Sequence, residues 1–115
     1  MKKQLNMQLT SYAPLIEFHG FVHSDVMKLK KTIPQELQKL VEKKKILQKD
    51  YENFTFHEIS GEVKDISGNT RPFIRMYSSE HVLVHLFADI LKNLKWSLEV
   101  EFIKITHYMD LRPKK

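Results

Sequence analysis

The chain has 115 residues, of which 42% are hydrophobic and 29% are charged, and its formal net charge is +5 at pH 7. These values fit a single globular domain with one core. There is no cysteine, which excludes disulfides, cysteine metal ligands and cysteine nucleophiles. The apolar stretches are far shorter than the roughly 20 residues that a membrane span needs. Polar residues at positions 4, 6, 8 and 10 interrupt any signal-peptide core. We therefore expect a cytoplasmic protein without membrane association.

Three segments follow from the pattern of the chain. Residues 1–13 form a polar N-terminal extension, residues 14–111 a single domain, and residues 112–115 a basic tail. The positive charge comes from lysines scattered over the first helical region and both ends. Scattered lysines favour solubility, whereas a single basic stripe would indicate nucleic-acid binding.

The first predicted strand covers residues 15–22, LIEFHGFV, and follows Pro14 directly. Its side chains alternate, so that Glu17 and His19 share one face. A proline fixes φ near −65° and has no N–H, which suits the first position of a strand.

The first predicted helix follows, with Ser24 or Asp25 as its N-cap. Apolar residues recur at spacings of three and four to about residue 44, and the stripe keeps its phase across Pro34. This pattern predicts one amphipathic helix with a kink at the proline.

The second half of the chain repeats the order strand, helix, strand. ENFTFHEIS (52–60) and RPFIRMYS (71–78) alternate as strands and flank a turn-rich connection. A helix over about 80–95 follows, with Ser78 or Ser79 as its cap. The last strand, from residue 97, changes phase at Ile103, which indicates either a bulge or burial of both faces.

The element order β-α-β-β-α-β predicts an α+β fold, a four-stranded mixed sheet with two helices on one face. The helices would cover Ile16, Phe18, Phe54, Phe56, Ile74 and Met76. The uncovered face would carry Leu15, Phe21, Ile59, Phe73, Tyr77 and Ile105 beside Glu17, His19, His57, Arg75 and Glu101. So much apolar surface is unusual on a monomer. We expect a homo-oligomer, with a trimer favoured, that buries this face; the alternative is that residues 1–12 fold back over it.

Four stretches, PLIEFHGF, NFTFHEI, RPFIRMY and EVEFIKITHYMDL, occur in this order with helices between them. Together they resemble an uncharacterised bacterial family of the tautomerase superfamily, whose best-known member is macrophage migration inhibitory factor. The resemblance covers residues 14–111. It implies two β-α-β units side by side, assembled as trimers, and a catalytic N-terminal proline whose place matches Pro14. It also implies binding of a substrate carboxylate, for which His19, Arg75 and Tyr108 are the candidates.

Pro14 departs from that pattern because 13 residues precede it. Its nitrogen is then an amide nitrogen, without a basic lone pair. Proline-amine chemistry would require N-terminal processing that frees Pro14. Glu17 would also disfavour an anionic substrate. His57 is a second candidate base, because histidine titrates near neutral pH. A purely structural polar interface made of His19, His57, Arg75, Tyr77 and Glu101 is the alternative interpretation.

We therefore expect a tautomerase-like oligomeric domain with a binding or structural role. One alternative is an RNA-binding module of ferredoxin-like topology, but the aromatic RNA-binding motif is absent, so we expect no nucleic-acid partner. Another is an active keto–enol tautomerase after processing. His81 and His85 have the i, i+4 spacing of metal pairs, but Val82 stands where zincins have glutamate and no third ligand is evident. We expect neither a metal nor a cofactor.

Overall fold

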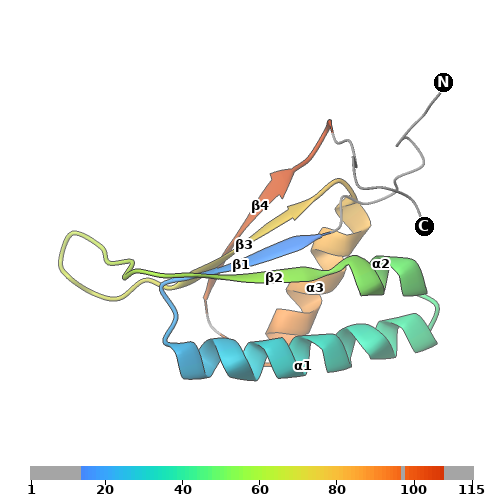
Figure 1. Ribbon diagram of the computed structural model, residues 1–115, viewed down its shortest axis with the longest axis horizontal. Coiled ribbons are helices and arrows are strands. Elements are labelled where there is room, and N and C mark those ends of the chain that lie inside the picture. The colour runs from blue at the N-terminus through green and yellow to red at the C-terminus, as the bar shows by residue number, and fades with distance from the viewer. Residues whose placement is uncertain (1–13, 97, 108–115) are drawn as a thin grey trace.

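The computed structural model describes residues 14–96 and 98–107 of the chain. In chain order its elements are β1 (Leu15–His19), α1 (His23–Glu42), α2 (Gln48–Asn53), β2 (Thr55–Ile59), β3 (Phe73–Ser78), α3 (His81–Asn93) and β4 (Glu99–Lys104). The strands form one sheet, and both α1 and α3 pack against the same face of it (Figure 1). The predicted α+β class and the placement of the two long helices are confirmed.

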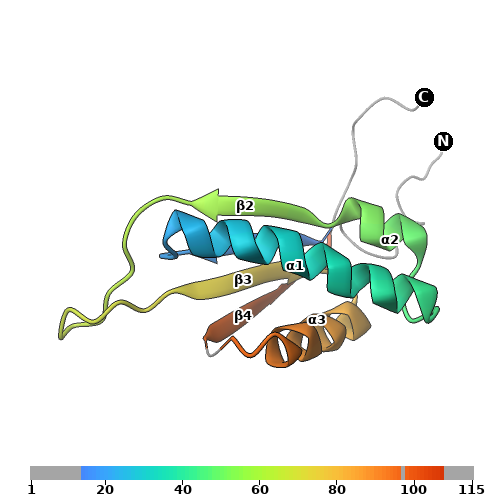
Figure 2. The same ribbon diagram turned by 90° about the horizontal axis from the view of Figure 1, so that it is seen from below.

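The sheet has the strand order β2-β1-β3-β4. Strand β1 is parallel to β2, β3 is parallel to β4, and the central pair β1·β3 is antiparallel. Each β-α-β unit therefore contains two adjacent parallel strands, joined by α1 in one unit and by α3 in the other (Figure 2). In a ferredoxin-like sheet the β-α-β units are split. The expected alternative of a ferredoxin-like topology is therefore wrong.

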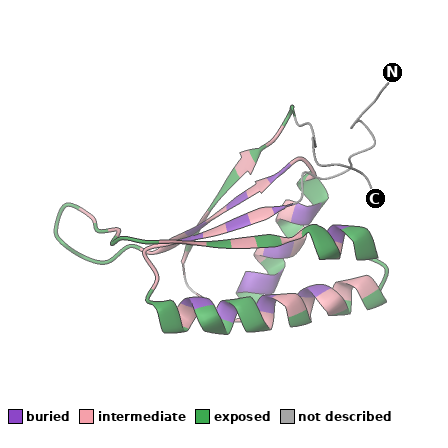
Figure 3. Ribbon diagram, in the orientation of Figure 1, coloured by how far each residue is buried: buried purple, intermediate pink, exposed green. Residues whose placement is uncertain are grey.

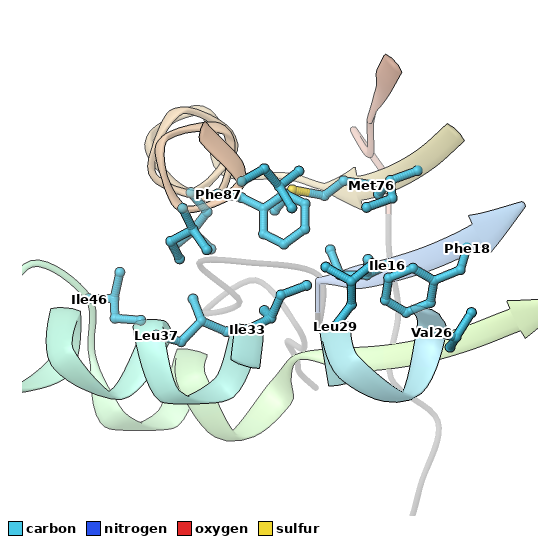
Figure 4. Close-up of a cluster of buried hydrophobic side chains, with 13 residues drawn as sticks. Ile16, Phe18, Val26, Leu29, Ile33, Leu37, Ile46, Met76 and Phe87 are labelled. Carbon is cyan, nitrogen blue, oxygen red and sulfur yellow. The ribbon is translucent and has the colours of Figure 1, made fainter. Parts of the chain in front are cut away.

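The core lies between the sheet and the two long helices (Figure 3). Strands β1 and β3 point alternate side chains into it, because side chains alternate between the faces of a sheet. The helices supply apolar residues at spacings of three and four, as their sequences predict. Figure 4 shows Phe18, Ile33, Met76 and Phe87 among the side chains that fill this layer.

Both long helices end in the same way. The N–H of Lys45 donates to the carbonyl of Leu40, and that of Lys44 donates to Val41. The same pair of bonds closes α3, from Trp96 to Leu91 and from Lys95 to Lys92. These are Schellman motifs, in which a left-handed residue satisfies the last carbonyls of a helix. Lysine takes the place that glycine usually holds, with φ of 61° at Lys44 and 64° at Lys95.

Several boundaries differ from the sequence-based expectation. Helix α1 starts after Val22 and α3 after Glu80, and neither has a side-chain N-cap, so the expected serine and aspartate caps are wrong. The short helix α2 was not expected, because its six residues, QKDYEN, carry no apolar stripe. Helix α1 continues through Pro34 as one helix. Strands β3 and β4 pair without interruption, which excludes the expected bulge in β4.

Phe21 also differs from its predicted place on the uncovered face. Its ring lies edge-on to Phe18 and Trp96, and it packs against the buried cluster. Strand β1 ends at His19, and Gly20 has φ of +77°. The strand alternation therefore stops before Phe21, and the turn points this side chain toward the core. No helix among residues 14–96 and 98–107 is long and apolar enough to span a membrane.

Candidate functional site

The face of the sheet opposite the helices, called here the open face, carries three rows of side chains. They follow from the strand register, since aligned residues in neighbouring strands point to the same side. Across β2, β1, β3 and β4 the first row is Thr55, Leu15, Tyr77 and Ile103, the second is His57, Glu17, Arg75 and Glu101, and the third is Ile59, His19, Phe73 and Glu99. A charged middle row thus lies between two rows of mostly apolar or aromatic character.

Glu17 is the centre of this cluster. Its Oε1 lies 2.8 Å from Nε2 of His19 and accepts a hydrogen bond of 3.3 Å from the Tyr77 hydroxyl. The Arg75 guanidinium is 3.9 Å from the same oxygen. Only 14% of the Glu17 side chain is exposed. A half-buried carboxylate needs such partners, because an unpaired charge would be costly to remove from water.

Arg75 is held by a second carboxylate. Its Nε donates to Oε1 of Glu101 at 2.6 Å. The hydrogen bond with Glu101, followed by that with Tyr77, holds the pKa of Arg75 above its ordinary value. Two carboxylates, Glu17 and Glu101, thus surround one guanidinium. The positive charge is already neutralised, so this arginine is poorly placed to attract a substrate carboxylate.

Phe73 supports two of these groups. The His19 ring stacks on it, with ring centres 4.5 Å apart and planes inclined by 4°. The Arg75 guanidinium carbon lies 5.3 Å from the centre of the same ring, within the range of a cation–π contact. Phe73 therefore fixes the orientation of His19 and Arg75, and the cluster is rigid on the side of β3.

The predicted site residues are brought together only in part. His19 and Arg75 both contact Glu17. His57 lies beside Glu17 in the register but is exposed on the edge strand β2. Pro14 precedes β1; its side chain is fully buried and its carbonyl accepts the N–H of Thr55 at 2.9 Å. Tyr108 lies outside the described residues.

Glu17 is the residue whose role sequence reasoning missed, since it was considered only as an obstacle to an anionic ligand. The period-2 alternation of β1 placed Glu17 on the same face as His19. Nothing in the sequence indicated that Arg75 and Tyr77, some 60 residues away, would converge on one oxygen of this carboxylate.

The histidine pair on α3 lies apart from this cluster. The two Nε2 atoms of His81 and His85 are 2.9 Å apart, and both side chains are exposed, as the helical phase predicts. No group of three or more histidine, aspartate or glutamate side chains that could hold a metal occurs in the part of the chain that the structure describes. The pair thus has fewer than the three or four protein ligands of an ordinary zinc site.

Comparison with known proteins gives the fold and nothing finer. No family model and no curated protein matches the chain. Among solved structures, a protein of unknown function from Vibrio cholerae O1 biovar eltor str. N16961 is similar, with a TM-score of 0.55 and 17% sequence identity. The alignment covers 85% of this chain and 84% of that one. At this identity the likeness shows a shared fold for a small α+β domain.

Proposed function

We propose that this chain is a tautomerase-like domain that assembles into a homo-oligomer, with a trimer favoured, through the open face of its sheet. Its role in that assembly is binding or structural, and it does not use proline-amine catalysis. The observation that carries the assembly is the composition of the open face. Apolar and aromatic side chains flank a charged row whose members are already paired within one chain.

The internal pairing matters for burial. An interface can cover charges at low cost only where they are hydrogen-bonded and neutralised. Glu17, Arg75 and Glu101 meet that condition without help from a partner. Leu15, Ile59, Phe73, Tyr77 and Ile103 supply the apolar area. A face of this kind resembles an obligate interface, which is more apolar than ordinary surface.

Changing Phe73 to glutamate is expected to dissociate the oligomer. The new carboxylate would lie beside Glu17, Glu99 and Glu101 and would be left unpaired in the interface. Light scattering at tens of micromolar protein should give an oligomeric mass for the wild type and a monomeric mass for Phe73→Glu. Phe102→Glu is the matched control, because Phe102 is an exposed phenylalanine on the other face of the sheet. A monomeric wild type would refute the proposed assembly.

The absence of proline catalysis rests on the chemistry and placement of Pro14. Its nitrogen belongs to a peptide bond and cannot act as a base. Its side chain is fully buried, so a substrate has no access to it. The group that the resemblance would make catalytic therefore has a geometric role at the start of β1.

The full-length chain is expected to show negligible tautomerase activity on phenylpyruvate. A version that begins Met-Pro14, from which the methionine is removed, is the contrast. Activity in that version alone would mean that residues 1–13 silence a competent pocket. Inactivity of both would leave the binding or structural role. Full-length activity that persists in Pro14→Ala would contradict the proposal and indicate His57 or His19 as the base.

A further inference from the structure

A projecting segment joins β2 to β3. Residues 60–72, called here the arm, extend away from the sheet at the end opposite the turn between α1 and α2 (Figures 1 and 2). Its base is fixed to the body: Arg71 pairs with Glu99 at 2.7 Å, and Val63 packs closely against the turn at Gly20. The arm is thus a structured projection with a defined direction.

The tip of the arm is a closed turn. The backbone N–H of Asp65 donates to the Asn69 carbonyl, and the N–H of Gly68 donates to the Asp65 carbonyl. The Asp65 carboxylate accepts the N–H groups of Ser67 and Asn69, both at 2.9 Å. The Asn69 N–H, together with that of Ser67, holds the pKa of the Asp65 carboxyl below its ordinary value. The turn therefore keeps its charged cap at neutral pH.

This turn presents Ile66 to solvent. The relative exposure of Ile66 is 104%, the highest among the exposed large hydrophobic residues of the described chain. Turn tips are ordinarily occupied by glycine, asparagine, aspartate or serine. An isolated surface isoleucine is unremarkable by itself, but here it stands on a hydrogen-bonded tip that reaches beyond the body of its own chain.

A matching apolar hollow lies at the other end of the molecule. It has a volume of about 260 Å³ and lies between the α1–α2 turn and the start of α3. Ile46 and Leu83 line it, and Leu47 and Val82 expose 56% and 60% of their surface beside it. Lys44 and Lys45 also line the hollow. Since a water molecule occupies about 30 Å³ of the liquid, the hollow has room for a branched aliphatic side chain.

We propose that Ile66 of one copy enters the hollow beside Leu47 and Val82 of a neighbouring copy. The arm and the hollow lie at opposite ends of the chain, so they cannot meet within one molecule (Figure 1). The carboxylate of Asp65, next to Ile66, then approaches the ammonium groups of Lys44 and Lys45. A contact between two different patches is heterologous, and it closes into a ring when the rotation between copies permits.

This contact rests on the proposed oligomer and adds a second interface to it. Burial of Ile66 and of the two side chains beside the hollow removes apolar surface from water at the ring joint. Ile66→Asp should therefore weaken association by roughly tenfold or more. Ser67→Asp on the same turn is the control and should leave association near the wild-type value, because its side chain is not the apolar group.

Cysteine pairing tests the geometry directly, because the chain has no cysteine of its own. We expect mild oxidation of Ile66→Cys/Val82→Cys to give covalently linked copies on a non-reducing gel, in a ladder that stops at the size of the ring. The matched control is Ile66→Cys/Val22→Cys, since Val22 is an exposed valine outside the hollow. The control pair should remain predominantly monomeric on the gel.

The outcomes separate the two proposals. An oligomeric wild type without links between positions 66 and 82 would overturn the arm contact and leave the assembly through the open face intact. A monomeric wild type by light scattering would overturn both. Equal linking in the Val22 control would also overturn the arm contact, because it would show random collision.

Discussion

Phe18→Ala is expected to lower the free energy of unfolding by about 3–5 kcal/mol. Phe18 is fully buried on the central strand β1, and its ring centre lies 5.9 Å from that of Phe21 and 5.8 Å from that of Phe56. Removing the ring loses apolar burial and leaves a cavity that its neighbours on strands and helix cannot fill without moving. Urea denaturation followed by circular dichroism measures the loss.

Phe102→Ala is the matched control for this substitution. It makes the same chemical change on strand β4, but Phe102 is 38% exposed. We expect a loss of only about 1 kcal/mol there, because less surface returns to water and no closed cavity forms. Both variants should be compared with the wild type at one protein concentration, since association changes apparent stability. Equal losses in the two variants would contradict the assigned core.

Gly20→Ala is expected to destabilise the fold by about 2–4 kcal/mol, through a left-handed backbone and an overpacked contact. Gly20 has φ of +77°, and an added Cβ would lie 3.0 Å from both Cβ and Cγ2 of Val63. The substitution therefore strains β1 and pushes on the base of the arm. Thermal or urea unfolding measures the effect.

Gly68→Ala separates the two causes. Its φ of +88° is similar, but an added Cβ there meets no atom within 4 Å. It should cost only the backbone contribution, about 1–2 kcal/mol. The difference between the two variants then reports the contact with Val63. A loss at Gly68 as large as that at Gly20 would show that the close approach contributes nothing.

The two helical stripes and the strand alternation were sufficient to predict the class of fold. In α1 the residues Val26, Leu29, Ile33 and Leu37 are all buried, and in β3 burial alternates along the strand. These patterns are local consequences of helix and strand geometry, with periods of 3.6 and 2. Because each element has only one strongly apolar side, the chain has few ways to bury them together. The sequence alone therefore determined which residues form the core.

The exceptions arise where local periodicity is absent or is interrupted. Helix α2 is too short and polar to show a stripe. The turn at Gly20 redirects Phe21 into the core, and a strand pattern cannot show where a strand stops. Lysine closes both Schellman motifs at positions where sequence rules look for glycine.

Only the tertiary structure decided the candidate site. The convergence of His19, Arg75 and Tyr77 on Glu17 depends on the register between β1 and β3, which come from distant parts of the chain. A shift of one residue would turn Arg75 toward the helices, because neighbouring residues of a strand point to opposite faces. That register is set by the packing of the whole core, including Phe18 and Ile74, which lie opposite each other on the central strands. The types of side chain on the open face were thus encoded locally, whereas their partners were fixed by long-range packing.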